Sequence, residues 1–163
     1  MKTTIRWTKG FFKNRYELFL NGSIAGSLKD KNWSQSSDGE FNGKQFLFKT
    51  TGFFKQSTQI TNSFTNEEVG RISYNSWGTR AIISIANKTV EFKYTNTWNT
   101  RWILYDNNGV LIHYRGTETK GDIEMDTLDE LLVLSGLFIK NHFSQSAALI
   151  IVILIPIFIA TNN

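Results

Sequence analysis

The segment "MDTLDELLVLSGLFI", residues 125–139, contains the feature that most limits how this chain can fold. Thr127 and Glu130 fit a capping box, in which each side chain satisfies a free backbone amide at the start of a helix. The sequence therefore predicts a helix over about residues 128–141. Residues 131–139 are apolar on every side of that helix, apart from one serine and one glycine. Because a helix without a polar face must be surrounded, the rest of the chain has to enclose it or leave it to lipid.

The chain before this helix has the pattern of consecutive β-hairpins. "YELFLNGSIAGSL" places Asn21-Gly22 between two apolar runs, and both residues tolerate the positive φ of a tight hairpin turn. "AIISIANKTVEFKY" has Asn87-Lys88 in the same role, and "RWILYDNNGVLIHY" has a longer turn. Apolar and polar residues alternate within the arms, as in strands with one buried face. About ten strands at such short spacing predict a barrel or a sandwich.

Four features follow one another along about residues 3–142: the "IAG" and "VGRI" strand starts after polar turns, the "LYDNNGV" hairpin, and the acidic, then apolar, helix. In this order they resemble the superfamily of tubby C-terminal domains, plant LURP-one-related proteins and phospholipid scramblases. The resemblance implies a mainly β fold, a closed antiparallel barrel of about twelve strands around the hydrophobic helix. It also implies phosphoinositide binding, membrane association or lipid movement, although no ligand residue of that superfamily can be matched to this chain. We expect residues 1–142 to form this tubby-like barrel.

Residues 143–163, "FSQSAALIIVILIPIFIATNN", carry no charged side chain. The apolar part, residues 147–160, would extend about 21 Å as a helix, which is short of the roughly 30 Å hydrocarbon core of a bilayer. The whole uncharged stretch, residues 143–161, is a candidate membrane anchor, and Lys140 and His142 before it would place the barrel on the cytoplasmic face. The alternative is a cytoplasmic, soluble chain in which this segment is buried in the barrel or in an oligomer.

Two segments interleave cations with aromatic residues: "RWTKGFFKNRY", residues 6–16, and "KYTNTWNTRW", residues 93–102. This mixture suits a membrane interface, where rings lie at headgroup depth and cations meet anionic lipid. It also suits single-stranded nucleic acid, and the simpler interpretation is that the rings belong to the core. The candidate lipid-binding residues are Arg6, Trp7, Lys9, Lys13, Arg15, Lys93, Trp98, Arg101 and Trp102.

The charge distribution is compatible with the same ligand, and an ordinary solvated surface is the simpler interpretation of it. Residues 1–60 hold ten Lys and Arg against four Asp and Glu, within a net charge of +4 for the chain. Such an excess attracts anionic surfaces. We expect membrane lipid as the main partner, allow a protein partner or a second copy of the chain, and do not expect nucleic acid.

The sequence carries no catalytic signature. It has no cysteine, no glycine-rich phosphate loop, no G-x-S-x-G elbow and no HExxH motif. His113 and His142 lack metal-ligand spacing, and Asp122, Glu124 and Asp126 alternate without the spacing of a calcium loop. The first ten residues lack the apolar segment of a secretory signal peptide. We expect no enzyme activity, no metal and no cofactor.

These observations lead to two hypotheses of function. The first is a non-enzymatic, membrane-associated barrel that docks on anionic lipid. The second is a soluble interaction or assembly module whose C-terminal segment is buried within the barrel or an oligomer interface.

Overall fold

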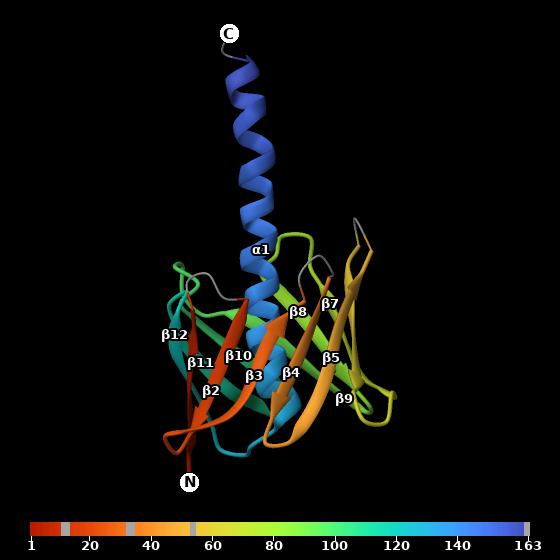
Figure 1. The fold of residues 1–163 in the computed structure, drawn as a ribbon, viewed down its shortest axis with the longest axis vertical. Coiled ribbons are helices and arrows are strands. Elements are labelled where there is room, and N and C mark those ends of the chain that lie inside the picture. The colour runs from red at the N-terminus through yellow and green to blue at the C-terminus, as the bar shows by residue number, and fades with distance from the viewer. Residues whose placement is uncertain (11–13, 32–34, 53–54, 162–163) are drawn as a thin grey trace.

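The computed structural model describes residues 1–10, 14–31, 35–52 and 55–161, with side chains described as far as Ala148. Within these residues, twelve antiparallel strands form a closed barrel around the first part of a single helix (Figure 1). The predicted fold class is therefore confirmed. The strands are β1 (Thr3–Lys9), β2 (Arg15–Leu20), β3 (Ser23–Asp30), β4 (Ser36–Phe41), β5 (Lys44–Thr51), β6 (Ser57–Asn62), β7 (Glu68–Tyr74), β8 (Arg80–Ile85), β9 (Lys88–Tyr94), β10 (Arg101–Asp106), β11 (Gly109–Gly116) and β12 (Lys120–Met125), and the helix is α1 (Glu130–Thr161).

Each strand pairs with its neighbours in the chain, and β1 pairs with β12 to close the barrel. Closure leaves none of the twelve described strands at an open edge. Because consecutive strands are antiparallel, the connections alternate between the two ends of the barrel. We call the end where α1 begins, after β12, the entry end, and the end where α1 leaves the barrel the exit end. The connections β1–β2, β3–β4, β5–β6, β7–β8, β9–β10 and β11–β12 all lie at the exit end.

The first of the predicted hairpin turns, between β2 and β3 at the entry end, is confirmed. Asn21 and Gly22 both have positive φ, at 53° and 83°, as a type I′ turn requires. The turn after β8 differs from its prediction by one residue, since it consists of Ala86 and Asn87, and Lys88 is the first residue of β9. The observed register pairs Ile85 with Lys88, and a shift by one residue would turn every side chain of the strand to the opposite face.

The interior of the barrel is filled by large side chains from the walls and by α1. The largest fully buried side chains of the wall include Trp7, Trp102, Phe41 and Phe48. From the helix, Leu132, Val133, Leu134, Leu137 and Ile139 are at most 2% exposed, and the ring of Phe138 stacks on Phe48 at 4.7 Å. The apolar helix predicted from the sequence is thus enclosed on every side by protein over this stretch.

The start of α1 lies two residues later than the capping box predicted. Asp129, rather than Thr127, caps the helix: its carboxylate Oδ1 accepts a hydrogen bond from the Leu132 amide at 3.0 Å. Glu130 does not complete a capping box from position N3 but opens the helix and forms an ion pair of 2.7 Å with Lys44. Residues 126–129 connect the end of β12 in the wall with the start of α1 inside the barrel (Figure 1).

The end of the helix differs more strongly from the prediction. Instead of a core helix ending near residue 141 and a separate tail from residue 143, α1 continues without interruption to Thr161 and projects beyond the exit end (Figure 1). Residues 140–148 contain neither glycine nor proline, so nothing in this stretch breaks the helix. The boundary at residue 143 therefore separates two parts of one helix.

Candidate functional site

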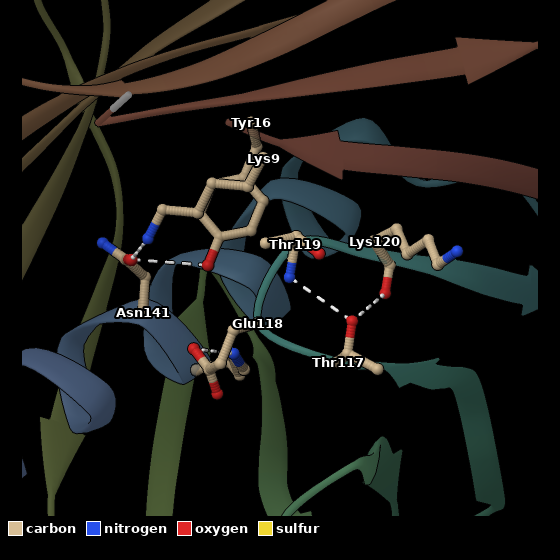
Figure 2. Close-up of polar contacts among 8 residues, drawn as sticks. Lys9, Tyr16, Thr117, Glu118, Thr119, Lys120 and Asn141 are labelled. Atoms are coloured by element: carbon tan, nitrogen blue, oxygen red, sulfur yellow. Dashed lines mark hydrogen bonds and ion pairs between the residues drawn. The ribbon is translucent and has the colours of Figure 1, made fainter. Parts of the chain in front are cut away.

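A set of polar side chains joins α1 to β1, β2 and β3 where the helix reaches the exit end, and we call Lys9, Tyr16, Asp30, Asn141 and Gln145 the polar collar. Asn141 is its centre and is only 3% exposed. Lys9 Nζ and the Tyr16 hydroxyl both donate to Asn141 Oδ1, at 2.7 and 3.3 Å, as Figure 2 shows. The Asn141 amide nitrogen donates to Asp30 Oδ2 at 2.8 Å. One helix residue is therefore bonded to β1, β2 and β3.

Further polar contacts tie the helix to the wall on both sides of Asn141. Gln145 donates to Asp30 Oδ2 at 2.7 Å, and the Ser37 hydroxyl donates to Asp30 Oδ1 at 2.6 Å. Lys140, which is 2% exposed, reaches Glu118 in the β11–β12 connection at 3.0 Å. Since hydrogen bonds to charged groups stabilise more than neutral ones, these contacts fix the position at which α1 leaves the barrel.

Lys9 is part of this network rather than a free surface cation. Burial lowers the pKa of its ammonium group, with the nearby Lys140 adding to the effect and Asp30 and Glu118 opposing it. Its ammonium group also lies over the ring of Tyr16, 4.9 Å from the centroid. The Lys9 ammonium group therefore already has interaction partners within the protein, in Asn141 and the ring of Tyr16.

His142 follows Asn141 on the helix and contacts β7 instead of β1 to β3. Its ring stacks on Tyr74 with centroids 4.3 Å apart, and the Tyr74 hydroxyl shares a hydrogen bond of 2.6 Å with Thr58. Burial lowers the pKa of the His142 imidazole below its ordinary value of 6.5. The folded protein therefore favours the neutral ring.

This burial predicts a pH dependence of stability. Because the unfolded chain binds a proton at His142 at higher pH than the fold does, the stability linked to this ring is complete above about pH 6.5 and is lost as the pH falls through the lower folded pKa. We expect the urea midpoint of the protein to fall between about pH 7 and about pH 5. His142→Phe keeps an aromatic ring on Tyr74 and removes the titration, so its midpoint should stay flatter over this window. If the urea midpoint changed with pH equally in His142→Phe and in the unmodified protein, the prediction would be contradicted.

A cavity of about 500 Å³ opens beside α1 at the exit end. Asp30, Asn141, His142 and Gln145 contribute to its lining, together with strand ends from β4 to β6. Every lining residue except Phe138 carries a polar side chain, so the cavity offers hydrogen-bond partners to water or to a polar group. Within the described part of the chain, no group of three or more His, Asp and Glu side chains is arranged to hold a metal ion.

The two buried tryptophans among the nine predicted lipid-binding residues are core residues. Trp7 and Trp102 are both 0% exposed. Their rings are 6.5 Å apart, Trp7 packs on Tyr16 at 5.3 Å, and Trp102 stacks on Tyr114 at 5.3 Å. They occupy inward positions of β1 and β10, so a ligand at the surface cannot reach them. The prediction of a surface role was wrong for both.

The other predicted residues are distributed between the wall and the exit end. Arg6 lies midway along β1 on the outer wall, 6.0 Å from the centroid of the Phe19 ring. Lys93 lies over Tyr105 at 4.6 Å. Arg15 and Arg101 are exposed at the exit end, and Trp98 is 84% exposed in the β9–β10 connection. Lys13 lies outside the described residues.

The two ends of the barrel carry opposite charge. Among described residues in the exit-end connections, or within two strand residues of them, the cations are Lys9, Arg15, Lys29, Lys31, Lys55, Arg80, Lys93, Arg101, Arg115 and Lys120, whereas the acids are Asp30 and Glu118. At corresponding places of the entry end, the acids are Glu40, Glu67, Glu68, Asp106, Glu124, Asp126, Asp129 and Glu130, and the cations are Lys2, Lys44 and Lys88. Five of these ten exit-end cations come from residues 1–60 and five from residues 80–120, so the basic end draws on the whole length of the barrel.

One exposed aromatic residue at the exit end was missed by the sequence analysis. Trp77 lies in the β7–β8 connection and is 86% exposed. The available signal was a short repeat, because "NSWGTR" at residues 75–80 matches "NTWNTR" at residues 96–101 in four of six positions. Among the described residues, the exit end therefore combines the polar collar, the cations named above, which we call the cationic rim, and the exposed Trp77 and Trp98.

Comparison with protein-family models, with curated proteins and with solved structures finds no match to this chain. Among the residues that the structure fully describes, no helix is both long and apolar enough to cross a membrane.

Proposed function

We propose that this protein is a non-enzymatic barrel that docks by its exit end on an anionic membrane surface, on the cytoplasmic side, with the apolar continuation of α1 held in the bilayer. One observation carries the proposal: the uncharged, apolar sequence from residue 147 onward continues from the cationic end of the barrel and not from the acidic end. The membrane association implied by the resemblance to tubby-like domains and scramblases agrees with it.

The charge separation supplies a physical reason for an end-on orientation. Each Lys or Arg near an anionic leaflet contributes about 1 kcal/mol of attraction, and this attraction falls off within a Debye length. The cationic rim is attracted by such a surface while the acidic entry end is repelled. A barrel with this charge distribution therefore approaches an anionic bilayer with its exit end, where the apolar segment begins, facing the membrane.

Charge reversal at one end tests the proposal. We expect Lys55→Glu with Lys120→Glu, both exposed at the exit end, to slow association with phosphatidylserine-containing vesicles by about tenfold at low salt, because two attractions become repulsions. The matched control, Lys2→Glu with Lys88→Glu, makes the same change of net charge at the entry end and should slow association far less. The measurement is the stopped-flow association rate of the full-length chain as a function of ionic strength.

Two results would count against the docking proposal. Equal slowing by both pairs would mean that net charge, not orientation, governs binding. Absence of binding to anionic vesicles by the unmodified chain would refute membrane docking altogether.

A further inference from the structure

Two connections at the exit end have the same internal construction. We call residues 75–80 and 96–101 the tryptophan loops, after Trp77 and Trp98 at their third positions. Each begins with asparagine and ends with threonine and arginine. The two loops are adjacent among the exit-end connections, since they flank the β8–β9 hairpin.

The first asparagine organises each loop through the same hydrogen bonds. Asn75 Oδ1 accepts from the amides of Thr79 and Arg80, both at 3.0 Å, and its amide nitrogen donates to the Thr79 hydroxyl at 3.0 Å. The Gly78 amide donates to the Asn75 carbonyl at 3.3 Å, and Gly78 has a positive φ of 64°.

The second loop repeats this framework bond for bond. Asn96 Oδ1 accepts from the amides of Thr100 and Arg101, both at 3.0 Å, and its amide nitrogen donates to the Thr100 hydroxyl at 2.7 Å. The Asn99 amide donates to the Asn96 carbonyl at 3.3 Å, with a positive φ of 55° at Asn99. Side-chain bonds of this kind hold short loops in one conformation.

This framework presents the indole rings to the outside instead of using them for packing. Trp77 and Trp98 are 86% and 84% exposed, while Trp7 and Trp102 are fully buried in the same barrel. None of the bonds that hold the loops involves a tryptophan side chain. Large apolar groups that a defined local structure holds in water are typical of a contact surface.

The loops are also fixed relative to α1. The ring of Phe143 packs against Tyr74, which precedes the first loop, at 5.7 Å, and against Tyr94, just before the second loop, at 6.4 Å. The same helix residue therefore braces the bases of both loops, immediately before α1 leaves the barrel.

Three features at this end indicate a bilayer as the occupant. Tryptophan is enriched at membrane interfaces, because its ring is apolar and its N–H can still meet water or headgroups. Each loop closes with an exposed arginine, Arg80 or Arg101, which suits anionic headgroups. The apolar continuation of α1 starts at the same end. A protein partner would need to accommodate all three together, whereas a membrane interface does so without a shaped pocket.

We infer that Trp77 and Trp98 insert their rings at the boundary between headgroups and acyl chains when the exit end docks. This inference rests on the proposed function and adds the contact residues and the depth of docking.

Single-cysteine labelling of the full-length chain tests the insertion, because the sequence contains no cysteine. Thr97→Cys, next to Trp98, carries an environment-sensitive NBD label, and Asn108→Cys at the entry end serves as the matched control. With anionic vesicles we expect a blue shift and quenching by shallow nitroxide lipids at position 97 and neither at position 108. If the chain binds and the label at 97 stays in water, the insertion is refuted while docking stands. If the chain does not bind at all, the proposed function itself fails.

A second measurement, the rate of dissociation from vesicles, tests the insertion without a label on the protein. Trp77→Ala with Trp98→Ala should raise the rate of dissociation from labelled vesicles at least about tenfold, because burial of two indole rings is lost. Phe64→Ala removes a ring that is 69% exposed at the entry end and should leave the rate within about twofold. Equal rates for the double variant and the unmodified chain would overturn the inference.

Discussion

Replacing Leu134 with aspartate should unfold the barrel. Leu134 is 0% exposed in the middle of the enclosed part of α1 and faces the wall near Gly39. The substitution removes a buried leucine, which costs about 2–5 kcal/mol, and adds an unpaired carboxylate at a fully buried position among apolar side chains. Because a domain is stable by only about 5–15 kcal/mol, we expect loss of the cooperative thermal transition or a fall in melting temperature of tens of degrees.

The matched control is Ile82→Asp on the outer face of β8. Ile82 is 44% exposed, so a carboxylate there stays in water and the melting temperature should change by only a few degrees. Circular dichroism on both purified variants, with the unmodified chain alongside, measures the difference. Similar melting of the two variants would mean that α1 is not enclosed by the barrel.

Ending the chain at Ala148 should abolish retention on vesicles without unfolding the protein. The polar contacts described between α1 and the barrel, from Glu130 at Lys44 to Gln145 at Asp30, lie before this point, and the helix beyond it projects out of the exit end (Figure 1). Removal of residues 149–163 takes away most of the apolar segment, and each buried methylene group contributes about 0.8 kcal/mol to membrane affinity. We expect the melting temperature to stay within a few degrees of the full-length value, and flotation with phosphatidylserine vesicles to be lost at moderate salt.

The opposite outcome distinguishes the second hypothesis from the first. If the shortened chain melted much earlier, or if a full-length oligomer separated into monomers, residues 149–163 would belong to a protein interface. The protein would then be the soluble assembly module that the sequence also allows. Size-exclusion chromatography with light scattering on both chains provides this comparison.

Part of the fold could be predicted because its signals are local. The asparagine-glycine turns and the alternation within hairpin arms depend on neighbouring residues, and both describe the strands well. A closed barrel could not be distinguished from a sandwich by these signals alone, since alternation reports which face of a strand is buried and not how the sheet curves. The cap at Asp129 was misplaced because Thr127 and Asp129 both suit the role, and the path from the wall to the helix decides between them.

The candidate site was less predictable because its contacts are distant in the sequence. Lys9 and Asn141, 132 positions apart, meet only once the barrel has closed around α1. Trp7 and Trp98 both stand beside cations, yet one lies in the core and the other in water. The difference follows from position, since Trp7 alternates with Ile5 on the inward face of β1, whereas Trp98 lies in a connection.

The unbroken course of α1 has a mechanical consequence. Only one residue separates Gln145, bonded to Asp30 in the barrel wall, from the start of the apolar stretch at Ala147, an axial distance of about 3 Å. In the proposed arrangement no flexible linker separates the barrel from its anchor. The barrel therefore cannot reorient independently of the embedded helix, as a domain on a flexible linker can. Its height above the bilayer and its rotation about the helix axis are set together, and a tilt of the embedded part turns the whole barrel with it.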